Sequence, residues 1–183
     1  GYIIEEKEKD FVQGAFGRYL SPAVVDEIIS NPDMIRQLGG EERVMTSFFS
    51  DLASFSSISE CLTPEELVNF INDYLSEMCV VIEQYGGTID KFEGDAILAF
   101  YGAPVYYDDH AVRGCMACID QQHHLVELRH RWKRDGLPTA VEALRDRWEA
   151  ENRLFAHVRM GLTAGPMVVG NMGSYNRTDY TMM

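Results

Sequence analysis

Long apolar runs are missing from this chain. No stretch of its 183 residues approaches the roughly 18 consecutive apolar residues that a transmembrane helix requires. The charged start, Gly1 to Asp10, also lacks the apolar core of a secretory signal peptide. We therefore expect these residues to lie in the cytoplasm, and membrane attachment of a full-length protein stays open.

Cysteine is scarce and does not form a metal or disulfide framework. Of the four cysteines, Cys115 and Cys118 make a C-x-x-C pair, but the second pair typical of a zinc site is missing. The pair falls within a helical apolar pattern, which predicts buried, reduced thiols. That pattern consists of Val112, Cys115, Met116, Ile119 and Val126. The adjacent His123 and His124 would point to different helix faces, so shared metal ligation is not indicated.

Basic residues are too few to balance the acidic ones. The chain has 16 Lys and Arg against 29 Asp and Glu, which gives a net charge of −13. An acidic surface of this kind repels nucleic acid and anionic membranes, so we expect no nucleic-acid partner. It would also repel a nucleotide, and a nucleotide site in this chain therefore needs local positive charge.

The order of the expected elements indicates an α+β fold. Thr63, Pro64 and Glu66 form the capping box and first turn of a helix whose apolar stripe predicts core packing. Further helices are expected near 109–133 and 137–153. Strands are expected near 43–50, in a hairpin over 88–101, and near 156–162. A turn at Ala164 and Gly165 is expected to lead into another strand near 167–171. The sum is a ferredoxin-like βαββαβ core with extra strands.

Residues 1–42 are expected to be a helical extension, separate from a single core that spans 43–183. A charged run opens the extension, and Ser21 with Pro22 starts a second helix. Gly39 and Gly40 are expected to end that helix and to loosen the join to the core.

Two aspartates, Asp51 and Asp95, stand where an expected strand meets a turn. Asp51 ends an apolar run that begins near Val44, and Asp95 follows the tight turn at Glu93 and Gly94. If the two strands pair, both carboxylates emerge at one edge of the sheet, where they suit Mg²⁺ or Mn²⁺ shared with nucleotide phosphates. The alternative is that each aspartate simply caps a turn.

Four segments resemble the catalytic domain of the class III nucleotidyl cyclases, the adenylyl and guanylyl cyclase family. They are FFSDLASFS, DKFEGDAILAFYGAP, HVRMGLTAGPMVVGNMGS and the closing RTDYTMM, and they follow one another in the family's order. The resemblance implies that a nucleoside triphosphate is cyclised to a 3′,5′-cyclic monophosphate and that pyrophosphate is released.

The resemblance also implies roles for particular residues. Asp51 and Asp95 match the metal-binding carboxylates, with the backbone carbonyl of Leu52 as a further ligand, for two Mg²⁺ or Mn²⁺ ions per active site. Lys91 matches the lysine that contacts adenine. Thr181 matches the second base-contacting position, which is threonine in the subgroup known for bicarbonate-responsive adenylyl cyclases.

These matches make ATP the expected substrate and an adenylyl cyclase in signal transduction the expected function. The alternatives are a guanylyl cyclase and a nucleotide-binding or dimerising module without turnover. Outside the motif, Lys91 would be an ordinary solvated lysine.

The family's assembly gives further expectations. Its domains pair head to tail, so that Asp51 and Asp95 of one chain would face Lys91 and Thr181 of the partner in a homodimer. Residues 1–42 resemble linkers that transmit signals from an upstream sensory or membrane module. The alternative is an inert helix packed on the core.

Two features depart from the family pattern. The phosphate loop, Ala53, Ser54, Phe55 and Ser56, can wrap its backbone N–H groups around phosphate. It has serine at 54, where the family usually has glycine, and this loses glycine's conformational freedom. The family's transition-state asparagine and arginine follow a short way beyond the position of Thr181, so we expect the natural chain to continue past Met183.

Overall fold

A five-stranded antiparallel sheet forms the centre of the computed structural model, which describes residues 25–26, 29–30, 39–174 and 177–183. The strands are β1 (Gly39–Leu52), β2 (Gly87–Glu93), β3 (Ala96–Tyr101), β4 (Val158–Ser174) and β5 (Arg177–Met182). The helices are α3 (Phe55–Ser59), α4 (Pro64–Gln84), α5 (His110–Asp135) and α6 (Thr139–Ala150).

The sheet order is β2-β3-β1-β4-β5. Helices α3 and α4 connect β1 to β2, and α5 and α6 connect β3 to β4. The first four strands and the two long helices are therefore the expected ferredoxin-like βαββαβ core, and β5 adds one edge strand. This confirms the predicted α+β fold.

Helix α4 begins where the sequence indicates and packs its apolar face into the core. The Thr63 side chain accepts from the backbone N–H of Glu66, and the Glu66 carboxylate accepts from the Thr63 N–H. The largest core cluster lies between the sheet and the helices, with Tyr74, Met78 and Ile82 of α4 fully buried in it.

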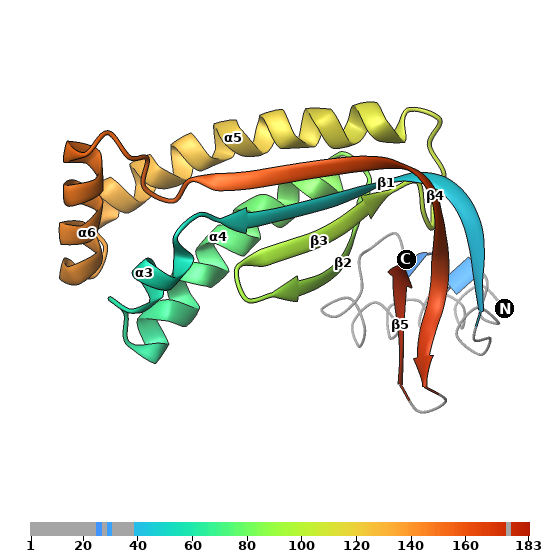
Figure 1. The fold of residues 1–183 in the computed structure, drawn as a ribbon, viewed down its shortest axis with the longest axis horizontal. Coiled ribbons are helices and arrows are strands. Elements are labelled where there is room, and N and C mark those ends of the chain that lie inside the picture. Colours follow the sequence, from blue (N-terminus) through green and yellow to red (C-terminus); the bar gives the residue numbers. More distant parts are fainter. Residues whose placement is uncertain (1–24, 27–28, 31–38, 175–176) are drawn as a thin grey trace, which may run out of the picture.

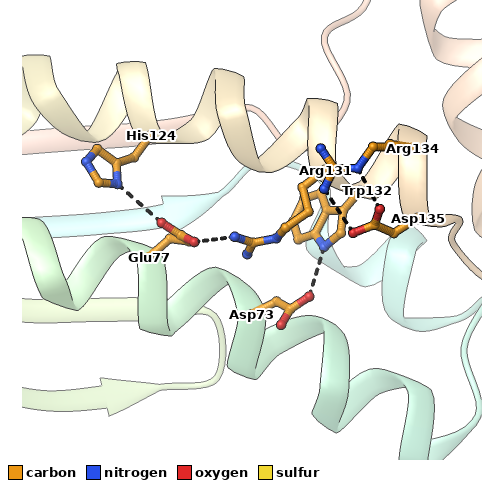
Figure 2. A network of polar contacts seen from close by, with 7 residues as sticks. All are labelled: Asp73, Glu77, His124, Arg131, Trp132, Arg134 and Asp135. Carbon is orange, nitrogen blue, oxygen red and sulfur yellow. Dashed lines mark hydrogen bonds and ion pairs between the residues drawn. The ribbon is translucent and has the colours of Figure 1, made fainter.

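Polar contacts join α4 to α5 along the edge of this core (Figure 2). Glu77 on α4 accepts from Arg131 and lies 3.2 Å from Nδ1 of His124, both on α5. One turn earlier on α4, Asp73 accepts from the indole N–H of Trp132 at 3.2 Å. The two helices are thereby fixed relative to each other.

The sheet curls strongly, so its two edge strands approach each other. Figure 1 shows β1 and β4 bending together, with β5 carried round toward β2. A second, smaller core cluster fills the curl with Met45, Phe100, Ala103 and Val169, against which Tyr180 and Met182 of β5 pack. Gly170 permits the bend, because a Cβ there would lie 2.2 Å from the carbonyl oxygen of Gly39.

The sequence prediction was wrong about where two strands begin and end. β4 runs unbroken through Ala164 and Gly165, which pair with Thr46 and Met45, so no turn occurs there. β1 begins at Gly39, and Gly39 and Gly40 pair with Asn171 and Gly170 instead of loosening a join. Long pairing with β1 outweighs the local turn preference of Gly165.

The prediction for α5 chose the wrong face. Cys115 is exposed and Cys118 half-buried, and the apolar stripe at Val112, Met116 and Ile119 is exposed to solvent. The face that packs inward carries His110, Gly114, Ala117, Gln121, Leu125, Leu128 and Trp132. Small residues decide this face, because a Cβ on Gly114 would lie 3.2 Å from the Leu162 side chain.

None of the helices in the described residues combines the length and hydropathy of a membrane span. The predicted helical pieces in residues 1–42 fall almost entirely outside the described part of the chain.

Candidate active site

Asp51 and Asp95 meet at one end of the central strands. β1 pairs with β3 up to Ser50 and Ile97, so the end of β1 and the β2–β3 turn lie side by side. The Leu52 backbone N–H, next to Asp51, donates to Oδ2 of Asp95 at 2.7 Å. The structure therefore brings together the two carboxylates that the sequence singled out.

Arg159 covers Asp51, a contact that the sequence reasoning missed. It lies directly opposite Asp51 in the β1–β4 ladder, and its Nε and Nη2 each donate to one carboxylate oxygen at 2.7 Å. The hydrogen bond to Asp51 raises the pKa of Arg159 further above its ordinary value. A basic residue on the strand after α6 was the available signal, but its strand register was needed to pair it with Asp51.

A buried tyrosine lies beneath the two carboxylates. Tyr74 comes from α4 and is fully buried beside Ser50, the residue before Asp51. Burial raises the pKa of Tyr74 far above its ordinary value, although the Ser50 hydroxyl lowers it, and the charges of Asp95 and Asp51 raise it further. Tyr74 is therefore a neutral hydroxyl at physiological pH.

The predicted phosphate loop turns sharply between β1 and α3. Ser54 adopts the left-handed conformation at φ 60° and ψ 30°, and α3 starts at Phe55. The Ala53 N–H donates to the carbonyl of His157 at 2.8 Å, and Nη2 of Arg153 lies 3.4 Å from the Ser54 hydroxyl. Ser56 is exposed in the first turn of α3. The segment before β4 thus holds this loop in place.

Lys91 and Thr181 also come together, through a residue between them. The Thr181 hydroxyl donates to Oδ2 of Asp90 at 2.6 Å, and Nζ of Lys91 lies 3.7 Å from Oδ1 of the same carboxylate. The Lys91 side chain is 45% exposed, whereas that of Asp90 is only 3% exposed. The sequence reasoning did not single out Asp90.

The donor set fits a metal shared with a ligand better than a closed protein site. No group of three or more His, Cys, Asp or Glu side chains suited to an ion occurs in the described residues. Two carboxylates and a backbone carbonyl suit Mg²⁺ or Mn²⁺, which commonly takes one or two carboxylates together with substrate phosphates. Asp51 and Asp95 therefore fit an ion that arrives with, or is completed by, a phosphorylated substrate.

Comparison with known proteins gives one consistent family. A family model described as the adenylate and guanylate cyclase catalytic domain matches residues 40–182. Adenylate cyclase 1 of Rhizobium meliloti (strain 1021) is 30% identical over 139 residues, which are 76% of this chain but 18% of that protein. The chain therefore spans less than a fifth of that relative's length.

Two solved structures match with nearly equal identity. The guanylyl cyclase Cya2 is 35% identical with a TM-score of 0.63, over 80% of this chain and 66% of that one. The adenylyl cyclase CyaB from P. aeruginosa is 34% identical with a TM-score of 0.67, over 80% and 68%. One of these proteins is a guanylyl cyclase and the other an adenylyl cyclase, so overall similarity does not separate the two kinds of cyclase.

Proposed function

Because the chain belongs to the adenylate and guanylate cyclase catalytic domain family, we propose that it converts ATP into 3′,5′-cyclic AMP and pyrophosphate. The observation that carries this proposal is the meeting of Asp51 and Asp95 at one end of β1, linked by the hydrogen bond from the Leu52 N–H. In the reaction the ribose 3′ oxygen bonds to the α-phosphorus, and the bond from that phosphorus to the pyrophosphate oxygen breaks.

Asp51, Asp95 and the Leu52 carbonyl would hold two Mg²⁺ or Mn²⁺ ions. Bound ions of this kind acidify the attacking hydroxyl and neutralise charge on the phosphates. The protein's share of the work is to position the nucleotide and to offset its charge, because phosphoryl transfer needs little covalent help from side chains.

Positive charge at the site comes from Arg159. The chain is acidic overall, and Arg159 is the guanidinium that contacts Asp51 directly. Its hydrogen bonds neutralise Asp51 in the free protein, so metal binding has to displace them. Once released, the guanidinium would remain beside the triphosphate. In the phosphate loop the Ala53 N–H is already bonded to the His157 carbonyl, so the backbone N–H groups of Ser54, Phe55 and Ser56 would bind the same phosphates.

Lys91 and Thr181 favour adenine as the base. A lysine donates only, which suits the acceptor at N1 of adenine and opposes the N–H at the same position of guanine. Guanylyl cyclase activity is the second candidate function, because Cya2 is as similar to this chain as CyaB is.

The face of the sheet that carries Asp51 is suited to a second copy of the chain. Residues alternate along β1, so Phe49 lies on the same face as Asp51, and this residue is 44% exposed. A head-to-tail homodimer would cover Phe49 and bring Lys91 and Thr181 of the partner to the carboxylates.

We further propose an upstream sensory or membrane module and a cytoplasmic location for this domain.

The decisive experiment incubates the purified protein, extended past Met183, with ATP or GTP in the presence of Mg²⁺ or Mn²⁺. Chromatography of the products should show cyclic AMP as the main product. Asp51→Ala should abolish the metal-dependent turnover, whereas Asp108→Ala, which changes an exposed aspartate before α5, should not.

Three results would contradict parts of the proposal. Cyclic GMP as the main product would favour the guanylyl cyclase. Nucleotide binding without any cyclic product would favour the module without turnover. Unchanged turnover in Asp51→Ala would end the assignment of the carboxylates.

A further inference from the structure

We propose that Asp90 sets the nucleotide preference by fixing the hydrogen-bond direction of Thr181. This inference rests on the proposed function, in which Lys91 and Thr181 contact the base. Asp90 makes no contact with the base in this proposal. It acts through Thr181 and is therefore a positioning residue.

A β-bulge places Asp90 where it can do this. The β2–β3 register passes from Ile89 opposite Ala99 to Lys91 opposite Leu98, so Asp90 is the extra, unpaired residue. Bulges redirect side chains and are common beside active sites. The Asp90 carboxylate is 97% buried, since only 3% of it is exposed, and it reaches Thr181 on the opposite edge strand.

The carboxylate dictates where the Thr181 proton goes. A threonine hydroxyl can donate or accept, but an ionised carboxylate can only accept. At 2.6 Å the Thr181 hydroxyl donates to Oδ2 of Asp90, which is the short distance of a charge-assisted O–H···O⁻ bond. The Thr181 oxygen consequently offers only lone pairs to a bound base.

Lys91 completes a complementary pair. Its ammonium lies 3.7 Å from Oδ1 of Asp90, and that oxygen has no hydrogen-bond partner within the described residues. The ammonium is therefore the partner that balances the Asp90 charge on this side. The site then presents one donor, from Lys91, and one acceptor, from Thr181.

This donor and acceptor match adenine and oppose guanine. Adenine presents an acceptor at N1 and an amino donor at N6, whereas guanine presents a donor at N1 and an acceptor at O6. If the Thr181 proton were free, its hydroxyl could turn and donate to O6 of guanine. Asp90 prevents that reversal and so discriminates against GTP at the second position.

Asp90→Asn is the direct test. An asparagine amide can donate to the Thr181 oxygen, which frees the threonine proton for a ligand acceptor. The ratio of kcat/KM for ATP to that for GTP should fall roughly tenfold in this variant, the effect of one reversed hydrogen bond. Asp179→Asn, an exposed aspartate on the same strand as Thr181, is the matched control and should leave the ratio unchanged.

A double-mutant comparison separates this role from a structural one. In a Thr181→Val background, which removes the hydroxyl, Asp90→Asn should no longer change the ATP to GTP ratio. A change of equal size in both backgrounds would show that Asp90 does not act through Thr181 and would overturn the proposal. An unchanged ratio in Asp90→Asn with the native threonine would overturn it too.

Binding measurements keep the test independent of turnover. The affinities of fluorescent ATP and GTP analogues should show the same loss of preference in Asp90→Asn. If that variant does not fold, two threonine variants replace it. Thr181→Val should lower the preference for the ATP analogue over the GTP analogue, and Thr181→Ser should retain it. A preference that Thr181→Val retains and Thr181→Ser loses would count against the proposal. A wild-type protein that binds neither analogue would instead contradict the proposed function.

Discussion

The Thr181 hydroxyl and the Asp90 carboxylate lie 2.6 Å apart although they belong to the two edge strands of the sheet. Four strand spacings separate β2 from β5 in the sheet order, and in a flat sheet these would amount to about 19 Å. The curl of β1 and β4 closes this gap (Figure 1). The candidate base-contacting residues therefore depend on sheet curvature for their position.

Asp95 should show separable effects on turnover and stability. Asp95→Asn keeps an oxygen that can accept from the Leu52 N–H but loses the charge, so we expect turnover to fall on the order of 10²- to 10³-fold with little change in stability. Asp95→Ala also leaves that N–H without its acceptor, which should lower the free energy of unfolding by about 1 to 3 kcal/mol. Urea unfolding alongside cyclase assays would check both. Equal stability of the two variants would contradict the role of this hydrogen bond.

Arg159 should compete with a cation for Asp51. Arg159→Met removes the two hydrogen bonds to the carboxylate, so Mn²⁺ should bind the nucleotide-free protein more tightly. Because the arginine is 64% exposed, solvent screening limits the expected gain to roughly two- to fivefold. Titration calorimetry with Mn²⁺ would measure it. Lys133→Met, which removes one charge from the last turn of α5, is the control, and weaker Mn²⁺ binding in Arg159→Met would refute the competition.

Ser54 should carry a conformational cost that glycine would relieve. Its φ of 60° lies in the left-handed region, which glycine adopts without penalty. Ser54→Gly should therefore raise the free energy of unfolding by about 0.5 to 1 kcal/mol. Ser57→Gly, inside α3, should instead lower it by a similar amount, about 0.5 to 1 kcal/mol. Thermal and urea unfolding would compare the two, and the same sign for both would be inconsistent with strain at Ser54.

Glu77 should make stability depend on acid pH. The hydrogen bond from Arg131 lowers the pKa of Glu77 below its ordinary value of 4.5, despite its partial burial. A carboxyl with a lowered pKa stabilises the fold above its ordinary pKa, and this stability disappears as the pH falls through the folded-state value. Glu77→Gln should therefore be less stable than wild type at pH 7, by about 0.5 kcal/mol, and the difference should shrink below pH 4.5.

Urea unfolding at several pH values would measure this difference. Glu127→Gln, which changes an exposed glutamate on α5, should show no comparable dependence. A Glu77→Gln difference that stays constant down to pH 3 would show that the ion pair with Arg131 does not stabilise the fold through its charge.

Local signals predicted those elements whose boundaries are set by local chemistry. The capping box at Thr63 and the apolar stripe through Tyr74 and Met78 depend only on residues of one helix. The start of α4 and its buried face could therefore be predicted from residue spacing alone. The α5 face could not. Its apolar residues at Val112 and Ile119 are exposed, because close contact of Gly114 with the sheet selects the opposite face.

The same division holds at the candidate site. Asp51 and Asp95 could be selected because each stands where a strand meets a turn, and paired strands bring such positions together. Arg159 and Asp90 could not, because the first depends on the β1–β4 register and the second on a bulge and the curl of the sheet.

The sequence by itself determined the βαββαβ order of the core, the acidic charge and the residues that resemble a cyclase site, since these depend on local spacing and residue chemistry. The tertiary structure decided which polar side chains contact one another. Register and sheet curvature arise from packing summed over many residues, and they alone place Arg159 on Asp51 and Asp90 on Thr181.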